Sequence, residues 1–265
     1  MARPSVSACI IAFNEEENIR ACLESVAWAD EIIVVDSFST DRTVEIAKAF
    51  DPKVKVIQRA WPGHVEQKNF ALNQASGDWV LSVDADERVS PELKQEILDT
   101  FDRGVEGVAG FSVPRKTWYL GRWIMRGGWY PDRKVRLVRR GAARWKGVNP
   151  HDHLYAEGRV ADLKGDLIHY TYRDISDHLR TIDSFTTISS RELYARKRGH
   201  ALLHMLLNPV ARFLRMYVLQ LGFLDGQAGF VLAVLSSYYV FLKYAKLWEL
   251  WRQGGPSGGK RPPSS

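Results

Sequence analysis

Short apolar runs and helix-like segments alternate along the first third of the chain. Each run is bounded by polar or turn-forming residues, which is typical of a strand buried inside a sheet. Strands that alternate with helices in this way predict a parallel sheet covered on both faces, so the predicted fold class is α/β. The predicted strands are 6–12, 31–36, 54–57 and 79–83, and the predicted helices follow at 19–26, 41–50 and 64–75.

Two side chains are predicted to begin helices. Asn14 is an expected N-cap, with Glu17 three residues later as its capping-box partner. Asp41 is the expected N-cap of the next helix, and this role keeps it out of the predicted site.

Beyond residue 90 the pattern changes twice. An aromatic and glycine-rich stretch at 118–131 precedes Arg133–Arg140, where basic and apolar residues alternate as in a half-buried strand. From Ile175 to Leu250 the spacing is helical. The other predicted elements are a helix at 91–101 and strands at 108–114 and 161–170. We therefore expect an α/β domain over 1–173, a helical region over 174–253 and a disordered Gly/Pro/Ser-rich tail over 254–265.

Acidic side chains follow the predicted strands. Asp36 ends the second strand, and Asp84 and Asp86 end the fourth with one small residue between them. In parallel sheets the ligand crevice lies beyond the carboxyl ends of the strands. Two carboxylates at i and i+2 point together if the chain is still extended, and hard oxygen ligands suit Mg²⁺ or Mn²⁺. The turn after the first strand, Ala12–Glu16, has no glycine, which argues against a Rossmann dinucleotide site.

Composition limits the partners and the compartment. The net charge of +6 and the pI near 9.3 indicate an anionic partner such as nucleotide phosphates or an acidic membrane surface. No nucleic-acid motif is present. Cys9 and Cys22 form no disulfide framework and no signal peptide is visible, so a cytoplasmic, reducing location is expected.

The C-terminal helices are unusually apolar. Ala201–Leu224 is strongly apolar but interrupted by Pro209, Arg212 and Arg215, and Gly226–Leu242 has no charge but falls short of the roughly 20 apolar residues of a spanning helix. Basic residues precede this region and two tryptophans follow it, a pattern that favours helices lying in a membrane interface. A helical hairpin packed on the catalytic domain and a dimer contact are the alternatives.

Several motifs occur in a fixed order along residues 5–250. They are Ile10–Ile19, Val34–Thr43, Gln67–Asn69 and Val83–Glu87, and in this combination they resemble the family 2 inverting glycosyltransferases. Further segments are most similar to the lipopolysaccharide core beta-1,4-glucosyltransferases, namely Trp61–Asn69, Pro150–Leu154, Ile168–Tyr170 and Gly222–Gly226. The resemblance implies a GT-A (Rossmann-like) nucleotide-diphospho-sugar transferase fold, a nucleotide-sugar donor, a divalent metal and single displacement with inversion.

The resemblance also implies roles for individual residues. Asp152, after His151, stands where the family has its catalytic base, although the closer relatives are expected to have Glu there. The implied nucleotide-sugar-binding residues are Phe13 and Glu15 at the base, Asp36 at the base or ribose, Lys68 at the diphosphate and Asp84 at ribose or metal. Asp86 is the implied metal ligand, with His169 as a further one.

On the residues alone, each of these side chains has a simpler interpretation. Glu15 suits the first turn of a helix, Lys68 suits a helix surface, and the Asp84/Asp86 pair suits a solvated acidic turn. His151, His153 and His169 could form a metal site or stand apart. The arginines at 133, 136, 139 and 140 suit a solvated strand face or a phosphate-bearing acceptor.

We therefore expect a metal-dependent inverting glycosyltransferase that moves a hexose, by resemblance glucose from UDP-glucose, to a lipopolysaccharide-core or other lipid-linked acceptor. Peripheral contact with the inner face of the cell membrane is expected. A sugar-1-phosphate nucleotidyltransferase is the nearest enzymatic alternative, but it would need a glycine-rich phosphate loop near the first strand. A non-catalytic, membrane-associated nucleotide-binding scaffold is the other alternative.

Overall fold

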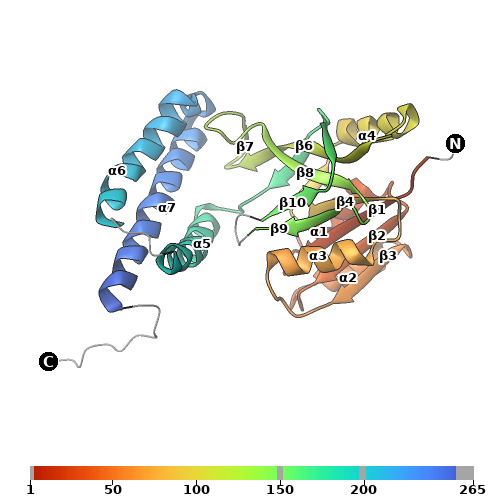
Figure 1. Ribbon diagram of the computed structural model, residues 1–265, viewed down its shortest axis with the longest axis horizontal. Coiled ribbons are helices and arrows are strands. Elements are labelled where there is room, and N and C mark those ends of the chain that lie inside the picture. Colours follow the sequence, from red (N-terminus) through yellow and green to blue (C-terminus); the bar gives the residue numbers. More distant parts are fainter. Residues whose placement is uncertain (1–2, 148–151, 197–200, 255–265) are drawn as a thin grey trace. The chain divides into compact units, whose positions relative to one another are not determined.

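The computed structural model describes residues 3–147, 152–196 and 201–254 (Figure 1). The chain divides into two compact units. The first unit comprises Met1–Trp123 and Trp129–Thr171, and the second comprises Ile124–Gly128 and Tyr172–Ser265. The predicted disordered tail lies outside the described residues except for Gly254.

The first unit begins with the predicted alternation of strands and helices. Strand β1 pairs in parallel with β2 on one side and β4 on the other, and β2 pairs in parallel with β3. The strands are β1 (Val6–Ala12), β2 (Glu31–Asp36), β3 (Val54–Gln58) and β4 (Trp79–Asp84), and the helices are α1 (Ile19–Val26), α2 (Thr43–Phe50) and α3 (His64–Gln74). This confirms the α/β fold class.

The rest of the first unit extends the same sheet with antiparallel strands. β8 pairs antiparallel with both β4 and β6, so the path is β3-β2-β1-β4-β8-β6-β12-β5, with β7 and β11 also on β6. β9 and β10 form a separate pair. These elements are β5 (Glu87–Val89), α4 (Pro91–Arg103), β6 (Val108–Tyr119), β7 (Arg122–Ile124), β8 (Asp132–Arg139), β9 (Ala143–Lys146), β10 (His153–Ala156), β11 (Arg159–Asp162) and β12 (Leu167–Tyr170).

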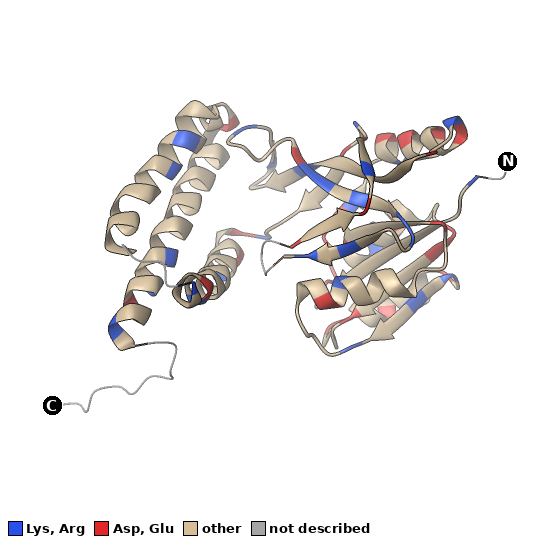
Figure 2. Ribbon diagram, viewed as in Figure 1, with Lys and Arg blue, Asp and Glu red and all other residues tan. Residues whose placement is uncertain are grey.

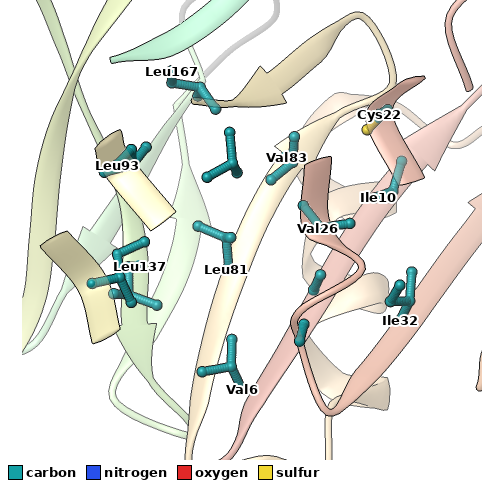
Figure 3. Close-up of a cluster of buried hydrophobic side chains, with 14 of the residues drawn as sticks. Val6, Ile10, Cys22, Val26, Ile32, Leu81, Val83, Leu93, Leu137 and Leu167 are labelled. Atoms are coloured by element: carbon teal, nitrogen blue, oxygen red, sulfur yellow. The ribbon is translucent and has the colours of Figure 1, made fainter. Parts of the chain in front are cut away.

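Apolar side chains cover both faces of the sheet. On one face, Ile10 of β1 and Leu81 of β4 pack with α1 and α4, whose Leu23 and Leu93 are fully buried (Figure 3). On the other face, Ile33 of β2 packs with α3 and with the β9–β10 pair. Burying a side chain of this size contributes about 1.5–3 kcal/mol, so the first unit has a substantial core.

Three local predictions were wrong. Asn14 does not cap α1: it has φ 55° and its Oδ1 accepts a hydrogen bond from Thr40 N, while Asn18 precedes the helix. Asp41 lies one residue before the N-cap of α2, although its Oδ1 accepts Thr43 N at 3.0 Å. The single strand expected at 161–170 is two strands, because the chain turns at Gly165, where a Cβ would lie 2.4 Å from Leu93 Cα.

The second unit is helical. It contains α5 (Ile175–Ala195), α6 (Ala201–Phe213), a π-helical segment η1 (Leu214–Leu219), a short 3₁₀ turn η2 (Gly222–Asp225) and α7 (Gly226–Gln253). The Gly222–Gly226 motif has a structural role, because buried Asp225 accepts hydrogen bonds from Met125 N and Arg126 N. A Cβ on Gly229 would lie 2.0 Å from Gly222 O, so the backbone needs glycine there.

Much of the second unit presents apolar side chains to solvent. We call these exposed side chains the apolar surface. The helices that carry most of them, α6 and the adjoining half of α7, have almost no charged residues (Figure 2). One helix, Gly222–Gln253, is long and apolar enough to cross a membrane by length and composition, which on its own is weak evidence for a span. The apolar surface consists of Leu202, Leu203, Leu206, Leu207, Val210, Leu214, Val218, Leu219, Leu221, Phe223, Leu224, Phe230, Val234, Tyr238, Phe241, Trp248 and Trp251.

Candidate active site

The carboxyl end of β4 brings three of the predicted residues together. Asp84 is the last residue of β4, and Lys68 reaches it from the buried face of α3. Lys68 Nζ lies 3.1 Å from Asp84 Oδ1 and 3.0 Å from Asp152 Oδ2. The Lys68 side chain is only 7% exposed, so it is not the surface lysine of the simpler interpretation. His151 lies outside the described residues.

A second cation, Arg136 of β8, completes this cluster. Its Nη2 lies 3.1 Å from Asp84 Oδ2 and 2.7 Å from Oε1 of fully buried Glu87, and its side chain is 3% exposed. Arg136 is therefore neither a solvated strand residue nor free to bind an acceptor phosphate. The sequence alone could not locate it, because the antiparallel pairing of Leu81 with Leu137 is what brings it to the end of β4.

The two cations set the charge state of Asp84. Burial alone would raise the pKa of this carboxyl, but Lys68 and Arg136 lower it well below its usual range. Burial would likewise lower the pKa of Arg136, but Glu87 and Asp84 raise it above its usual value. Asp84 is thus ionised at neutral pH and is balanced by protein cations.

Asp86 has a different partner from Asp84. Strand β4 ends at Asp84 and the chain turns, so the two carboxylates do not continue an extended strand. Asp86 Oδ2 lies 3.2 Å from His169 Nε2, and Asp86 O accepts a hydrogen bond from Tyr170 N at 3.0 Å. Thr117 Oγ1 lies 3.5 Å from the other ring nitrogen of His169.

The Asp86–His169 pair has donor chemistry that suits a divalent metal. A carboxylate oxygen and an imidazole nitrogen are both ligands that Mn²⁺ accepts in proteins. Within the described part of the chain, no group of three or more His, Cys, Asp or Glu side chains is arranged to hold a metal ion. Asp86 and His169 are the two side chains of this pair that would hold such an ion. His153 lies exposed on β10.

The ends of β1 and β2 carry the other predicted residues. Phe13, beyond β1, is 55% exposed, and Phe38, beyond β2, is 54% exposed. Phe38 is not among the residues predicted from the sequence. Two exposed aromatic rings at adjacent strand ends suit stacking on a nucleobase. Glu15 Oε2 accepts a hydrogen bond from Asn18 Nδ2 at 2.8 Å.

Asp36 is fully buried and organises the loop after β2. Its carboxylate accepts hydrogen bonds from the backbone and hydroxyl of Ser39 and from Gln58 Nε2. This loop also carries Phe38, which has a positive φ of 61°. Asp36 therefore fixes the position of an exposed aromatic ring through the backbone.

Trp145 lies beside the cluster of Lys68 and its carboxylate partners. The sequence did not predict it as a site residue. Asn69 of α3 holds its backbone with two hydrogen bonds, of 2.8 Å to Trp145 N and 3.0 Å to Trp145 O. Lys68 Nζ lies 4.2 Å from the centre of the indole ring, within cation–π range. The Gln67–Asn69 motif thus supplies a cation and the amide that positions the ring beside it.

Comparison with known proteins identifies the family of the chain. The family profile of Glycosyl transferase family 2 matches residues 7–155, which include every predicted site residue except His169. The chain belongs to glycosyl transferase family 2. It is 28% identical over 254 residues to the lipopolysaccharide core biosynthesis glycosyltransferase LpsC of Rhizobium meliloti (strain 1021), with 92% of each chain covered.

Other relatives agree with this assignment. An uncharacterized glycosyltransferase of Rickettsia typhi is 30% identical over 256 residues, covering 92% of this chain and 87% of the relative. Among solved structures, the mannosyltransferase PcManGT of Pyrobaculum calidifontis, determined with GDP-Man and Mn²⁺, matches with a TM-score of 0.56 at 15% identity. That match covers 94% of this chain and 88% of PcManGT, and it supports the GT-A fold.

Proposed function

We propose that this family 2 glycosyltransferase is a metal-dependent inverting hexosyltransferase that uses a UDP-sugar, UDP-glucose in the first instance. The acceptor is a lipopolysaccharide-core or other lipid-linked glycan. The observation that carries the proposal is the position of Lys68 between Asp84 and Asp152, because inverting transfer needs both a base and a cation for the leaving group, and this site supplies both.

Asp152 is the proposed catalytic base. It takes the proton of the acceptor hydroxyl as the oxygen attacks the anomeric carbon from the face opposite the diphosphate. One carbon–oxygen bond forms while the bond to the diphosphate breaks, so the configuration inverts and no covalent enzyme intermediate is needed. Lys68 balances the charge that develops on the departing diphosphate.

Asp86 and His169 are the proposed metal ligands. A divalent ion held there would supply Lewis-acid stabilisation of the leaving diphosphate. Asp84 already has two protein cations, so we assign it to the ribose side of the donor and leave the metal to Asp86 and His169.

The nucleoside is proposed to lie at the ends of β1 and β2. Phe13 and Glu15 contact the base there, and we add Phe38 as a second stacking ring on the strength of its exposure. Asp36, proposed from the resemblance to contact the base or ribose, acts mainly through the loop that it orders.

The lipid-linked acceptor is supported by two observations. The relative LpsC carries the name of a lipopolysaccharide core enzyme. The apolar surface of the second unit consists of many exposed large apolar side chains, and Arg212, Arg215 and Lys243 lie in the same region of the chain. We therefore propose that residues 174–253 act as a membrane-interfacial region at the inner face of the cell membrane, with basic side chains meeting anionic headgroups.

A panel of nucleotide sugars tests the proposed activity. Purified protein is incubated with each donor and a lipopolysaccharide-core acceptor, in Mn²⁺, in Mg²⁺ and in EDTA, and released nucleotide is measured. We expect metal-dependent release of UDP from UDP-glucose. Release from a different donor would correct the sugar. Formation of nucleotide sugar from a sugar 1-phosphate would favour the nucleotidyltransferase, and binding without any turnover would favour the scaffold.

A further inference from the structure

The Lys68 ammonium group contacts two carboxylates that differ in the other cations around them. It lies at nearly the same distance from Asp84 and Asp152, 3.1 Å and 3.0 Å. Asp84 has a second cation, since Arg136 Nη2 lies 3.1 Å away on its other oxygen. For Asp152, Lys68 is the one ion-pair partner that the described residues provide. Removing Lys68 would therefore leave Asp84 with Arg136, and leave Asp152 without an ion-pair partner from the described part of the chain.

Among the described residues, no second cation forms an ion pair with Asp152. His64, one turn earlier on α3, has its pKa lowered by burial and by the charge of Lys68, against the opposite effect of the Asp152 and Asp84 charges. Trp145 covers the ammonium group from one side. The Asp152 side chain is 11% exposed, so water screens the pair only partly.

We propose that Lys68 exchanges partners during the reaction: it holds Asp152 in an ion pair while the donor is absent, and binding of a nucleoside diphosphate draws Lys68 away and releases Asp152 as a free carboxylate. This inference rests on the proposed function, because it assumes that Lys68 meets the diphosphate. It gives Lys68 a second role, in coupling donor binding to the availability of the base.

The physical basis is competition for one cation. A diphosphate carries more negative charge than a carboxylate and accepts stronger charge-assisted hydrogen bonds, so it is the better partner for an ammonium group. A carboxylate oxygen engaged by an ammonium group is a poorer proton acceptor than a free one. The base therefore becomes competent only when the leaving group is in place, and the donor is expected to bind productively before the acceptor.

Carboxyl labelling measures the exchange directly. A carbodiimide and an amine modify accessible carboxylates, and mass spectrometry reports the modification of Asp152. The probe is UDP or GDP with Mn²⁺, because without a sugar the diphosphate leaves the space in front of Asp152 open. We expect labelling of Asp152 to rise at least about fivefold at saturating nucleotide, the lower end of typical coupling between two sites.

Two variants sharpen the test. In Lys68→Met without nucleotide, Asp152 should be labelled to the level that the wild type reaches at saturating nucleotide. Adding nucleotide to this variant should cause no further rise. The matched control is Lys55→Met, which removes an exposed lysine paired with Glu31 and should behave as the wild type. Asp152→Asn should bind UDP at least about fivefold more tightly than the wild type, because Lys68 no longer has to leave a carboxylate.

The outcomes distinguish a failure of the partner exchange from a failure of the proposed function. Nucleotide binding with unchanged Asp152 labelling, or unchanged UDP affinity in Asp152→Asn, would overturn the exchange and leave the proposed function standing. A nucleotide-dependent rise in labelling without sugar transfer would overturn the proposed function and leave the exchange standing. If neither UDP nor GDP binds, both are wrong. If Lys68→Met does not fold, the wild-type titration and Asp152→Asn still decide.

Discussion

Asp84 and Asp86 are two residues apart, yet they belong to different parts of the site. Asp84 is held by Lys68 and Arg136, whereas Asp86 contacts His169. This division follows from where β4 ends, since the turn after Asp84 redirects the next carboxylate. An Asp-X-Asp motif at a strand end therefore need not place both carboxylates on one metal ion.

This division predicts the effect of removing one carboxylate. Asp86→Asn should weaken Mn²⁺ binding by more than about tenfold, because a neutral amide is a much poorer ligand than a carboxylate. The measurement is Mn²⁺ titration followed by electron paramagnetic resonance, with UDP present. The exposed Asp99→Asn on α4 is the control and should bind Mn²⁺ as the wild type does. Equal affinity in both variants would place the metal elsewhere.

At the scale of the elements, the apolar runs predicted β1 to β4 well, because a buried parallel strand needs continuous apolar residues. The pattern could not reveal β5, β9 and β10, which are only three or four residues long. The positions of Arg136 and Trp145 depend on strand pairings between distant segments, and no local pattern encodes those pairings. Asp84 is predicted from its place at a strand end and Lys68 and Asp152 by resemblance, and the fold places Lys68 in contact with both carboxylates.

One carboxylate ties several of these elements together. Glu31, at the start of β2, accepts hydrogen bonds from Ser7 of β1, from Ser76 before β4 and from Lys55 of β3. Partial burial alone would raise the pKa of Glu31, but these hydrogen bonds lower it to about 2. The folded pKa lies below the usual value, so its stabilising contribution is present above about pH 4.5 and is lost as pH falls towards 2.

Glu31→Gln should therefore lower the free energy of unfolding by about 1–2 kcal/mol at pH 7, since hydrogen bonds to a charged group are lost. The difference in unfolding free energy between Glu31→Gln and the wild type should shrink as the pH falls from the usual pKa of 4.5 towards the folded pKa of about 2. Urea unfolding at a series of pH values from 7 to 3 measures it. Glu24→Gln, on the exposed side of α1, is the control. A difference that stays constant with pH would contradict the assigned role of the Glu31 charge.

At the scale of the whole molecule, one unit carries the candidate site and the other carries the apolar surface. Helix Gly222–Gln253 passes the test of length and composition for a span, but charged residues occupy its second half from Lys243 onwards. This distribution favours a helix that lies in the interface and keeps its charges among the headgroups. A lipid-linked acceptor would then reach the enzyme at the membrane surface.

Membrane binding should therefore depend on anionic lipid and on α6. The protein should sediment with vesicles containing phosphatidylglycerol more strongly than with pure phosphatidylcholine vesicles, and added salt should weaken the binding. Replacing exposed Leu206 and Leu207 by Glu should reduce binding more than about tenfold, since two apolar side chains proposed to enter the membrane are lost and two negative charges are added. Leu179→Glu on α5 is the matched control. Equal binding of both variants would exclude the apolar surface as the contact.

Asp152 is proposed to remove the acceptor proton, whereas other residues bind the diphosphate. This central claim is tested most directly by measuring sugar transfer and UDP binding side by side in Asp152→Asn. We predict that transfer falls by about 10²–10⁴-fold, the usual contribution of general base catalysis, while UDP with Mn²⁺ still binds at least as tightly as to the wild type. Transfer within a few-fold of the wild type would show that another group is the base and would contradict the account.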